Sequence, residues 1–189
     1  MEVRKLKIVA DLLEFEDERV ELIDGEIVQR PMARSEHALI QSGLSDEILP
    51  FKRRSDKGGC WIMTEISVRH GEHQCPTHDL AGWRKERFPD RPSGLMDIFP
   101  DWVSEITSPG HERKDLFHNF LLLQQHRVPF YWVVCPEEKT LIAYRLTDES
   151  YKVIFSVACK SPKDFRPVRI PPFEAVEIDL AYVFGTDVS

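Results

Sequence analysis

The sequence PDWVSEITSPGHERKDLFHN at residues 100–119 contains the features that decide the fold. Its apolar run at 102–106 carries one acidic residue, Glu105, and ends in the turn-forming sequence TSPG. After the turn, apolar residues recur at the spacing of a helix, and a second apolar, β-prone run follows at 128–135. This order predicts two parallel strands joined by a helical, right-handed crossover, with the second strand buried on both faces.

Glu105 and Asp79 are the two acidic residues that this pattern singles out. A carboxylate within an apolar strand is costly to bury unless it has a metal, a cation or a hydrogen-bond partner. Asp79 lies upstream, again directly before apolar residues, in the sequence HDLAGW. Two carboxylates on neighbouring strands can hold a divalent metal such as magnesium, which prefers oxygen ligands and activates water for phosphodiester hydrolysis. The alternative is that both are ordinary, solvated carboxylates at strand edges.

The flanking segments predict a single domain, residues 1–189, built on a mixed α/β sheet with helices against it. An Asp-Gly pair between two β-prone runs predicts an N-terminal β-hairpin. Helices are expected at 6–15 and 35–49, and the second of these is expected to place Leu39 on its apolar face. Strands are expected at 60–68, from Asp79 onward, at 141–146 and at 151–157.

The composition favours a globular protein that does not contact membranes. Hydrophobic residues make up 42% of the chain and charged residues 30%, and no apolar run approaches the roughly 20 residues that span a bilayer. The N-terminal sequence lacks the continuous apolar region of a signal peptide, so we expect a cytoplasmic protein. The four cysteines are far apart and form no C-x-x-C pair, so no disulfide framework is implied.

The net charge of −7 argues against nonspecific binding of nucleic acid, which depends on neutralising phosphates. Two basic stretches, at 52–57 and 84–87, flank the acidic residues in sequence. They form either a local basic groove beside the proposed site or solvated loops. A nuclease function depends on the first interpretation, or else it has to overcome the unfavourable net charge.

A second candidate metal site is the sequence HGEHQCPTH at 70–78, which contains His70, His73, Cys75 and His78. Histidine and cysteine are zinc ligands, but this spacing matches no common structural zinc pattern. Alternation along a strand would also send His73 and Cys75 to one face, and His70 and His78 to the other. Scattered loop histidines are the alternative interpretation.

Four stretches of the chain carry a family resemblance: ELIDGEIVQRPMARSEHALIQSGL at 21–44, THDLAGWRKERFP at 77–89, PDWVSEITSPG at 100–110 and RKDLFHNFLLLQQHRVPFYWVVCP at 113–136. Together they resemble the Uma family of restriction-endonuclease-like proteins, in the PD-(D/E)XK nuclease superfamily. The resemblance extends over about 20–184. It implies a mixed sheet flanked by helices, a site for Mg²⁺ or Mn²⁺ at one edge of the sheet, and DNA as the partner.

The resemblance also implies roles for individual residues. Asp79 matches the aspartate of the family's PD element, with His78 in place of the proline, and Glu105 matches the acidic residue of the second motif. Both would be metal ligands. The lysine that relatives carry on the following helix falls on Asn119, which can orient water but brings no charge to the phosphate. His37 lies where relatives also carry histidine, and it has either a catalytic role near the site or a local hydrogen bond at the helix start.

Two functions remain open. The first is a metal-dependent endonuclease that hydrolyses phosphodiester bonds, with Asp79 and Glu105 as ligands of Mg²⁺ or Mn²⁺ and Asn119 as a degenerate third position. The second is a catalytically inactive member of the fold that serves as a binding or assembly module. The two carboxylates favour the first function, whereas the missing lysine and the acidic net charge favour the second. The fold cannot decide between them, because function depends on the site and not on the scaffold. The buried strand and the aromatic-rich hairpins are also compatible with a homodimer.

Overall fold

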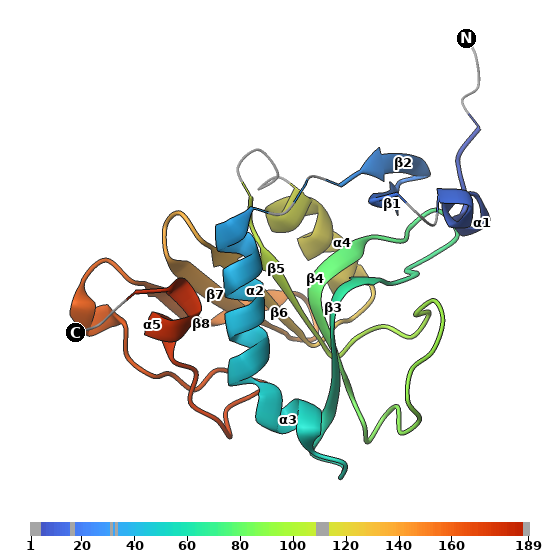
Figure 1. Ribbon diagram of the computed structural model, residues 1–189. Coiled ribbons are helices and arrows are strands. Elements are labelled where there is room, and N and C mark those ends of the chain that lie inside the picture. The colour runs from blue at the N-terminus through green and yellow to red at the C-terminus, as the bar shows by residue number, and fades with distance from the viewer. Residues whose placement is uncertain (1–4, 16–17, 31, 33, 109–113, 187–189) are drawn as a thin grey trace.

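The computed structural model describes residues 5–15, 18–30, 32, 34–108 and 114–186 (Figure 1). Its main feature is a six-stranded sheet in the order β3-β4-β5-β6-β7-β8. The strands are β3 (Cys60–Ser67), β4 (Thr77–Arg84), β5 (Trp102–Ile106), β6 (Phe130–Cys135), β7 (Thr140–Leu146) and β8 (Tyr151–Ala158). Neighbouring strands are antiparallel except for β5 and β6, which are parallel. The mixed α/β sheet predicted from the sequence is therefore confirmed.

The parallel pair of β5 and β6 is the crossover predicted from the opening stretch. β6 is buried on both faces along nearly its whole length, which explains why its sequence is apolar without alternation. The connection contains a π-helical segment, Lys114–Asn119, that continues directly into α4 (Phe120–Gln125). Single π-helical turns inside helices are rare and are found frequently at functional sites. This segment places the predicted third site residue, Asn119, at the point where the π geometry ends.

The predicted N-terminal hairpin consists of β1 (Val20–Ile23) and β2 (Glu26–Gln29). Its Asp-Gly turn has positive φ at both residues, 49° and 74°, as a two-residue type I′ turn requires. The backbones of Leu22 and Cys75 exchange two hydrogen bonds, 3.2 and 2.8 Å long, that attach the hairpin to the loop before β4. The end of β2 is thereby fixed close to the start of β4.

The remaining helices are α1 (Val9–Leu12), α2 (Ser35–Glu47), α3 (Leu49–Arg53) and α5 (Leu180–Phe184), with 3₁₀ turns at Leu13–Phe15 and Pro162–Asp164. The helix predicted at 35–49 divides into α2 and α3, because Ile48 leaves helical geometry with ψ 7° and Pro50 occupies the first turn of α3. The expectation for Leu39 is wrong, since this side chain is 69% exposed. Each residue turns a helix by about 100°, and it is the next residue, Ile40, that faces the sheet.

Two hydrophobic cores lie on opposite faces of the sheet. Figure 1 shows α2 crossing one face, and Ile40 and Leu44 of α2 pack there with Trp102 and Trp132. On the other face, Leu123 of α4 packs with side chains from β4, β5 and β6. Within the described ranges, no helix combines the length and apolar character needed to cross a bilayer. The site described below lies between these two cores, at the end of the sheet that carries the hairpin.

Candidate metal site at the separation of β4 and β5

The candidate site lies where β4 and β5 separate. Their backbone pairing ends at Leu80 and Ser104. Beyond this point the Asp79 backbone N–H donates to Glu105 Oε2 at 3.2 Å, and the Ile106 backbone N–H donates to Asp79 Oδ2 at 2.7 Å. Both carboxylates are buried. The structure thus brings the two predicted acidic residues together, and each accepts a hydrogen bond from the neighbouring strand.

The second oxygen of Glu105 contacts two further side chains. His78 Nδ1 lies 2.6 Å from Glu105 Oε1, and Asn119 Nδ2 donates to the same oxygen at 3.0 Å. Asn119 is fully buried, and so is His78, the residue in the place of the family's proline. Both oxygens of Glu105 therefore have partners within the protein, as a buried carboxylate requires.

His37, in the first turn of α2, faces the remaining oxygen of Asp79. Its Nε2 lies 3.3 Å from Asp79 Oδ1, and its Nδ1 lies 3.2 Å from Ser108 Oγ. Burial lowers the pKa of His37, but the nearby carboxylates, Asp79 first among them, raise it by more, so the pKa lies above its usual value. His37 is thus placed to share a proton or a metal ion with Asp79.

Glu65 of β3 completes the group, although no motif in the sequence marks it. Its backbone has φ 49°, a left-handed conformation that residues other than glycine rarely adopt, and strain of this kind clusters at functional sites. Its carboxylate accepts Arg30 Nη1 at 2.7 Å and Gln41 Nε2 at 3.2 Å. Burial raises the pKa of Glu65, but the hydrogen bond and charge of Arg30 outweigh it, so the pKa is lowered and Glu65 is ionised.

The register of the β3–β4 hairpin is the signal that would have identified Glu65. Thr64 pairs with Leu80 and Ile66 pairs with His78, which places Glu65 opposite Asp79. That register depends on the length of the turn between the strands. A single glutamate in a half-exposed strand does not by itself indicate a site.

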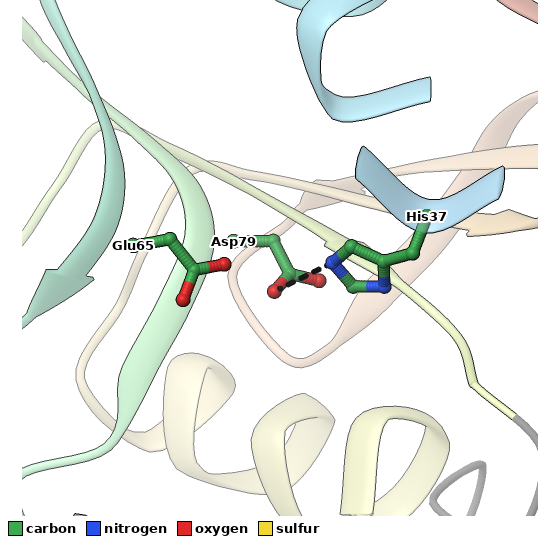
Figure 2. Close-up of side chains that lie close together, drawn as sticks. All are labelled: His37, Glu65 and Asp79. Carbon is green, nitrogen blue, oxygen red and sulfur yellow. Dashed lines mark ion pairs between the residues drawn. The ribbon is translucent and has the colours of Figure 1, made fainter. Parts of the chain in front are cut away.

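His37, Glu65 and Asp79 converge from α2, β3 and β4 (Figure 2). One ligand atom of each lies within 4.8 Å of the other two, and no other such group of three occurs in the described part of the chain. Two carboxylates and an imidazole are ligands for divalent cations: carboxylates suit Mg²⁺ and Mn²⁺, and imidazole suits transition metals. The residues present therefore fit a single divalent cation.

A cavity of about 250 Å³ adjoins this group. It lies between the start of α2 and the loops that follow β5 and β6, and is lined by Arg34, Glu36, His37, Thr107, Ser108, Pro136 and Glu137. The first N–H groups of a helix point outward and favour anions, and Arg34 adds a positive charge at the same place. The two glutamates oppose an anion, so the cavity is mixed in charge rather than basic.

The zinc interpretation of the sequence HGEHQCPTH is wrong. His70 Nε2 and His78 Nε2 lie 3.2 Å apart, but the other two candidate ligands are elsewhere. His73 Nδ1 donates to the backbone oxygen of Lys7 at 2.7 Å, and Cys75 is buried in a separate N-terminal cluster. A structural zinc site needs four convergent ligands, which this segment does not supply.

The two basic stretches, at 52–57 and 84–87, do not form a groove beside the site. Asp79 and Arg84 are separated by five residues of extended strand, or about 17 Å. Figure 1 shows α3, where the first stretch begins, at the opposite end of β3 and β4 from the hairpin. Any phosphate contact near the site must therefore come from other residues.

Comparisons with known proteins agree with this architecture. A family model for Uma2, described as "Putative restriction endonuclease", matches residues 8–177. A crystal structure from Anabaena variabilis, described as a "putative nuclease belonging to DUF820", superposes with a TM-score of 0.73. The alignment covers 94% of this chain and 97% of that chain at 23% sequence identity, which shows a shared fold. Among curated proteins, no sequence matches. Because the family model spans most of its length, the chain belongs to the Uma2 family of restriction-endonuclease-like proteins.

Proposed function

We propose that this protein is a metal-dependent endonuclease that hydrolyses phosphodiester bonds in DNA. The observation that carries the proposal is the convergence of His37, Glu65 and Asp79 at the sheet end, within a fold that the family shares. The three side chains come from three different elements, so their proximity does not follow from any one of them.

Asp79, Glu65 and His37 would hold the cation. When bound, a divalent cation polarises a phosphate oxygen and lowers the pKa of a water molecule. In the reaction, a water oxygen forms a bond to phosphorus while the bond from phosphorus to the leaving sugar oxygen breaks. The proton that water loses passes to solvent, and the leaving oxygen takes a proton from solvent. The imidazole makes Mn²⁺ a better match than Mg²⁺ for this set of ligands.

The role predicted for Glu105 as a second metal ligand stays a prediction. Its oxygens accept hydrogen bonds from the Asp79 backbone and Asn119, and His78 lies against it. These contacts support a role in fixing the strand that carries Asp79. The cavity beside His37 would receive the phosphate and sugar next to the cleaved bond, with Arg34 and the start of α2 as the contacting groups.

Calorimetric titration of Mn²⁺ and Mg²⁺, paired with a plasmid-nicking assay, tests the proposal. We expect the wild type to bind Mn²⁺ and nick plasmid, and Asp79→Asn and Glu65→Gln each to weaken metal binding at least about tenfold. Glu177→Gln is the matched control, because Glu177 forms an exposed ion pair with Arg169 in another part of the structure. A wild type that binds no metal at millimolar concentration, with its fold confirmed by circular dichroism, would defeat the proposal.

A catalytically inactive binding module is the second candidate, and one observation favours it. Asn119 carries no charge, and its amide nitrogen is engaged by Glu105. For this candidate, the wild type would retain DNA in a mobility-shift assay but cleave neither plasmid nor linear DNA with Mn²⁺ bound. The homodimer and the cytoplasmic location remain predictions from the sequence.

A further inference from the structure

The candidate site lacks a positive charge at the position where the family resemblance predicts a lysine. Asn119 occupies that position, and its Nδ2 is committed to Glu105 at 3.0 Å. Hydrolysis of a phosphodiester builds negative charge on the phosphoryl oxygens, and a fixed cation aimed at that charge is among the largest contributions to catalysis. Another residue must therefore supply the charge if the site is catalytic.

Arg30, directly after β2, lies next to two carboxylates of the candidate metal site, those of Glu65 and Asp79. Its Nη1 donates to Glu65 Oε2 at 2.7 Å, and its Nη2 lies 3.9 Å from Asp79 Oδ1. Within the described part of the chain, no other arginine or lysine has ion pairs with both carboxylates. Arg30 reaches the site only because the hairpin is attached to the loop before β4.

Several contacts hold Arg30 in this place. Its backbone N–H donates to the Arg19 carbonyl oxygen at 2.7 Å, which extends the hairpin ladder by one residue. Its side chain is only 13% exposed. Burial lowers the pKa of Arg30, but Glu65, Glu21 and Asp79 raise it by more, so the guanidinium stays charged.

We propose that Arg30 is a catalytic residue that contacts a non-bridging oxygen of the cleaved phosphate and supplies the charge that Asn119 cannot. The assignment rests on the nuclease function proposed above. A guanidinium has five N–H donors in a planar fork, and the contact to Glu65 uses one of them. The 3.9 Å separation from Asp79 is too long for a direct hydrogen bond, so Nη2 is available to a phosphate oxygen next to Asp79.

The simpler explanation is that Arg30 only neutralises Glu65 and keeps the hairpin docked. The two roles differ in what they affect. A structural arginine would change metal affinity and stability when removed. A catalytic arginine would change the rate of cleavage while metal binding persists, and a lysine at the same position would restore part of the rate.

The experiment compares Arg30→Gln and Arg30→Lys with the wild type and with Arg169→Gln. The control removes an arginine from an exposed ion pair of 3.3 Å with Glu177, outside the site. Single-turnover cleavage of DNA with saturating Mn²⁺ gives the rate, and calorimetry gives the Mn²⁺ affinity. We expect Arg30→Gln to lose about 100-fold in rate while its Mn²⁺ affinity is unchanged or higher, because a charge that competes for Glu65 is removed, and Arg30→Lys to recover about tenfold in rate.

Two results would overturn the assignment while leaving the nuclease function standing. One is an Arg30→Gln variant that cleaves as fast as Arg169→Gln. The other is an Arg30→Gln variant that loses Mn²⁺ affinity in proportion to its rate. A wild type that binds Mn²⁺ but cleaves no DNA would defeat the proposed function itself and the catalytic role of Arg30 with it.

Discussion

At the scale of single residues, His37 gives a direct test of the proposed metal site, because it is the one imidazole among the three candidate ligands. Replacing it by aspartate leaves three carboxylates, and oxygen ligands of this kind suit Mg²⁺ as well as Mn²⁺. We expect His37→Asp to lower the preference for Mn²⁺ over Mg²⁺, the ratio of their affinities, by about tenfold in calorimetric titrations. His73→Asp is the control, because His73 bonds to Lys7 away from the site. An unchanged ratio in His37→Asp would show that the imidazole does not bind the cation.

The site residues that the sequence predicted are those that a motif marks. Asp79 and Glu105 stand at the ends of apolar strands, and Asn119 and His37 occupy positions recognisable from related motifs. Glu65 and Arg30 could not be predicted in this way. Glu65 depends on a left-handed backbone conformation within a strand, and Arg30 depends on where the hairpin docks. Both depend on tertiary structure, which a local sequence pattern does not predict.

At the scale of elements, the C-terminus of α4 has an arginine, Arg127, at a backbone position where glycine is preferred. Arg127 has φ 56°, its N–H donates to the Gln124 carbonyl at 3.1 Å, and the Val128 N–H donates to the Leu123 carbonyl at 2.9 Å. This is a Schellman motif, in which glycine is the preferred residue at the left-handed position. A side chain at this position costs free energy, because its Cβ crowds the following carbonyl oxygen.

We therefore expect Arg127→Gly to raise the free energy of unfolding by about 0.5–1 kcal/mol, as measured by urea denaturation. Arg127→Ala removes the same side chain, including its 3.3 Å contact to the Asp148 carbonyl, but keeps the Cβ. It should show no gain. Equal stabilities of the glycine and alanine variants would mean that the left-handed backbone is not what limits this helix end.

Elements with a strong periodic pattern were predicted correctly, and the details at their ends were not. The hairpin, β5, β6 and the β7–β8 pair follow from alternating or continuous apolar runs bounded by turn residues. The sequence does not predict the division between α2 and α3, because the apolar pattern continues past Ile48 although the helical backbone geometry ends there. The π-helical segment at Lys114–Asn119 was missed as well, since one extra residue in a turn leaves the overall spacing nearly unchanged.

At the scale of the whole molecule, the fold gathers four distant segments at one end of the sheet. The hairpin, α2, the β3–β4 pair and the end of β5 each contribute to the site. The order β3-β4-β5-β6-β7-β8 explains this gathering, because β4 and β5 are adjacent and antiparallel, so the start of β4 and the end of β5 meet at the same end of the sheet. A sequence predicts such strands one at a time, whereas their neighbours depend on packing across the entire sheet.

The buried histidines behind Glu105 couple the stability of the whole fold to pH. His70 lies 3.2 Å from His78 through their Nε2 atoms, stacks on Phe99 at 5.3 Å and contacts His126 at 5.0 Å between ring centroids. Burial, followed by the charges of His78 and His126, lowers the pKa of His70 to about 2. In the unfolded chain its pKa is about 6.5. The unfolded state therefore binds the proton more readily, and His70 opposes folding increasingly as the pH falls below about 6.5.

This linkage predicts a pH-dependent difference between the wild type and His70→Gln, which keeps a hydrogen-bonding side chain but does not titrate. Between pH 7.5 and 5.5 the wild type should lose about 1.4 kcal/mol more of its unfolding free energy than the variant, since each unit below the unfolded pKa costs about that amount. Urea denaturation at the two pH values measures both losses. Titrating groups that do not contact His70 are common to both proteins and cancel in the comparison, so equal losses would mean that His70 takes up its proton without unfolding. In that event His70 would be accessible to solvent in the folded protein, and the packing of His70 and His78 behind Glu105 would be less rigid than the burial of these side chains indicates.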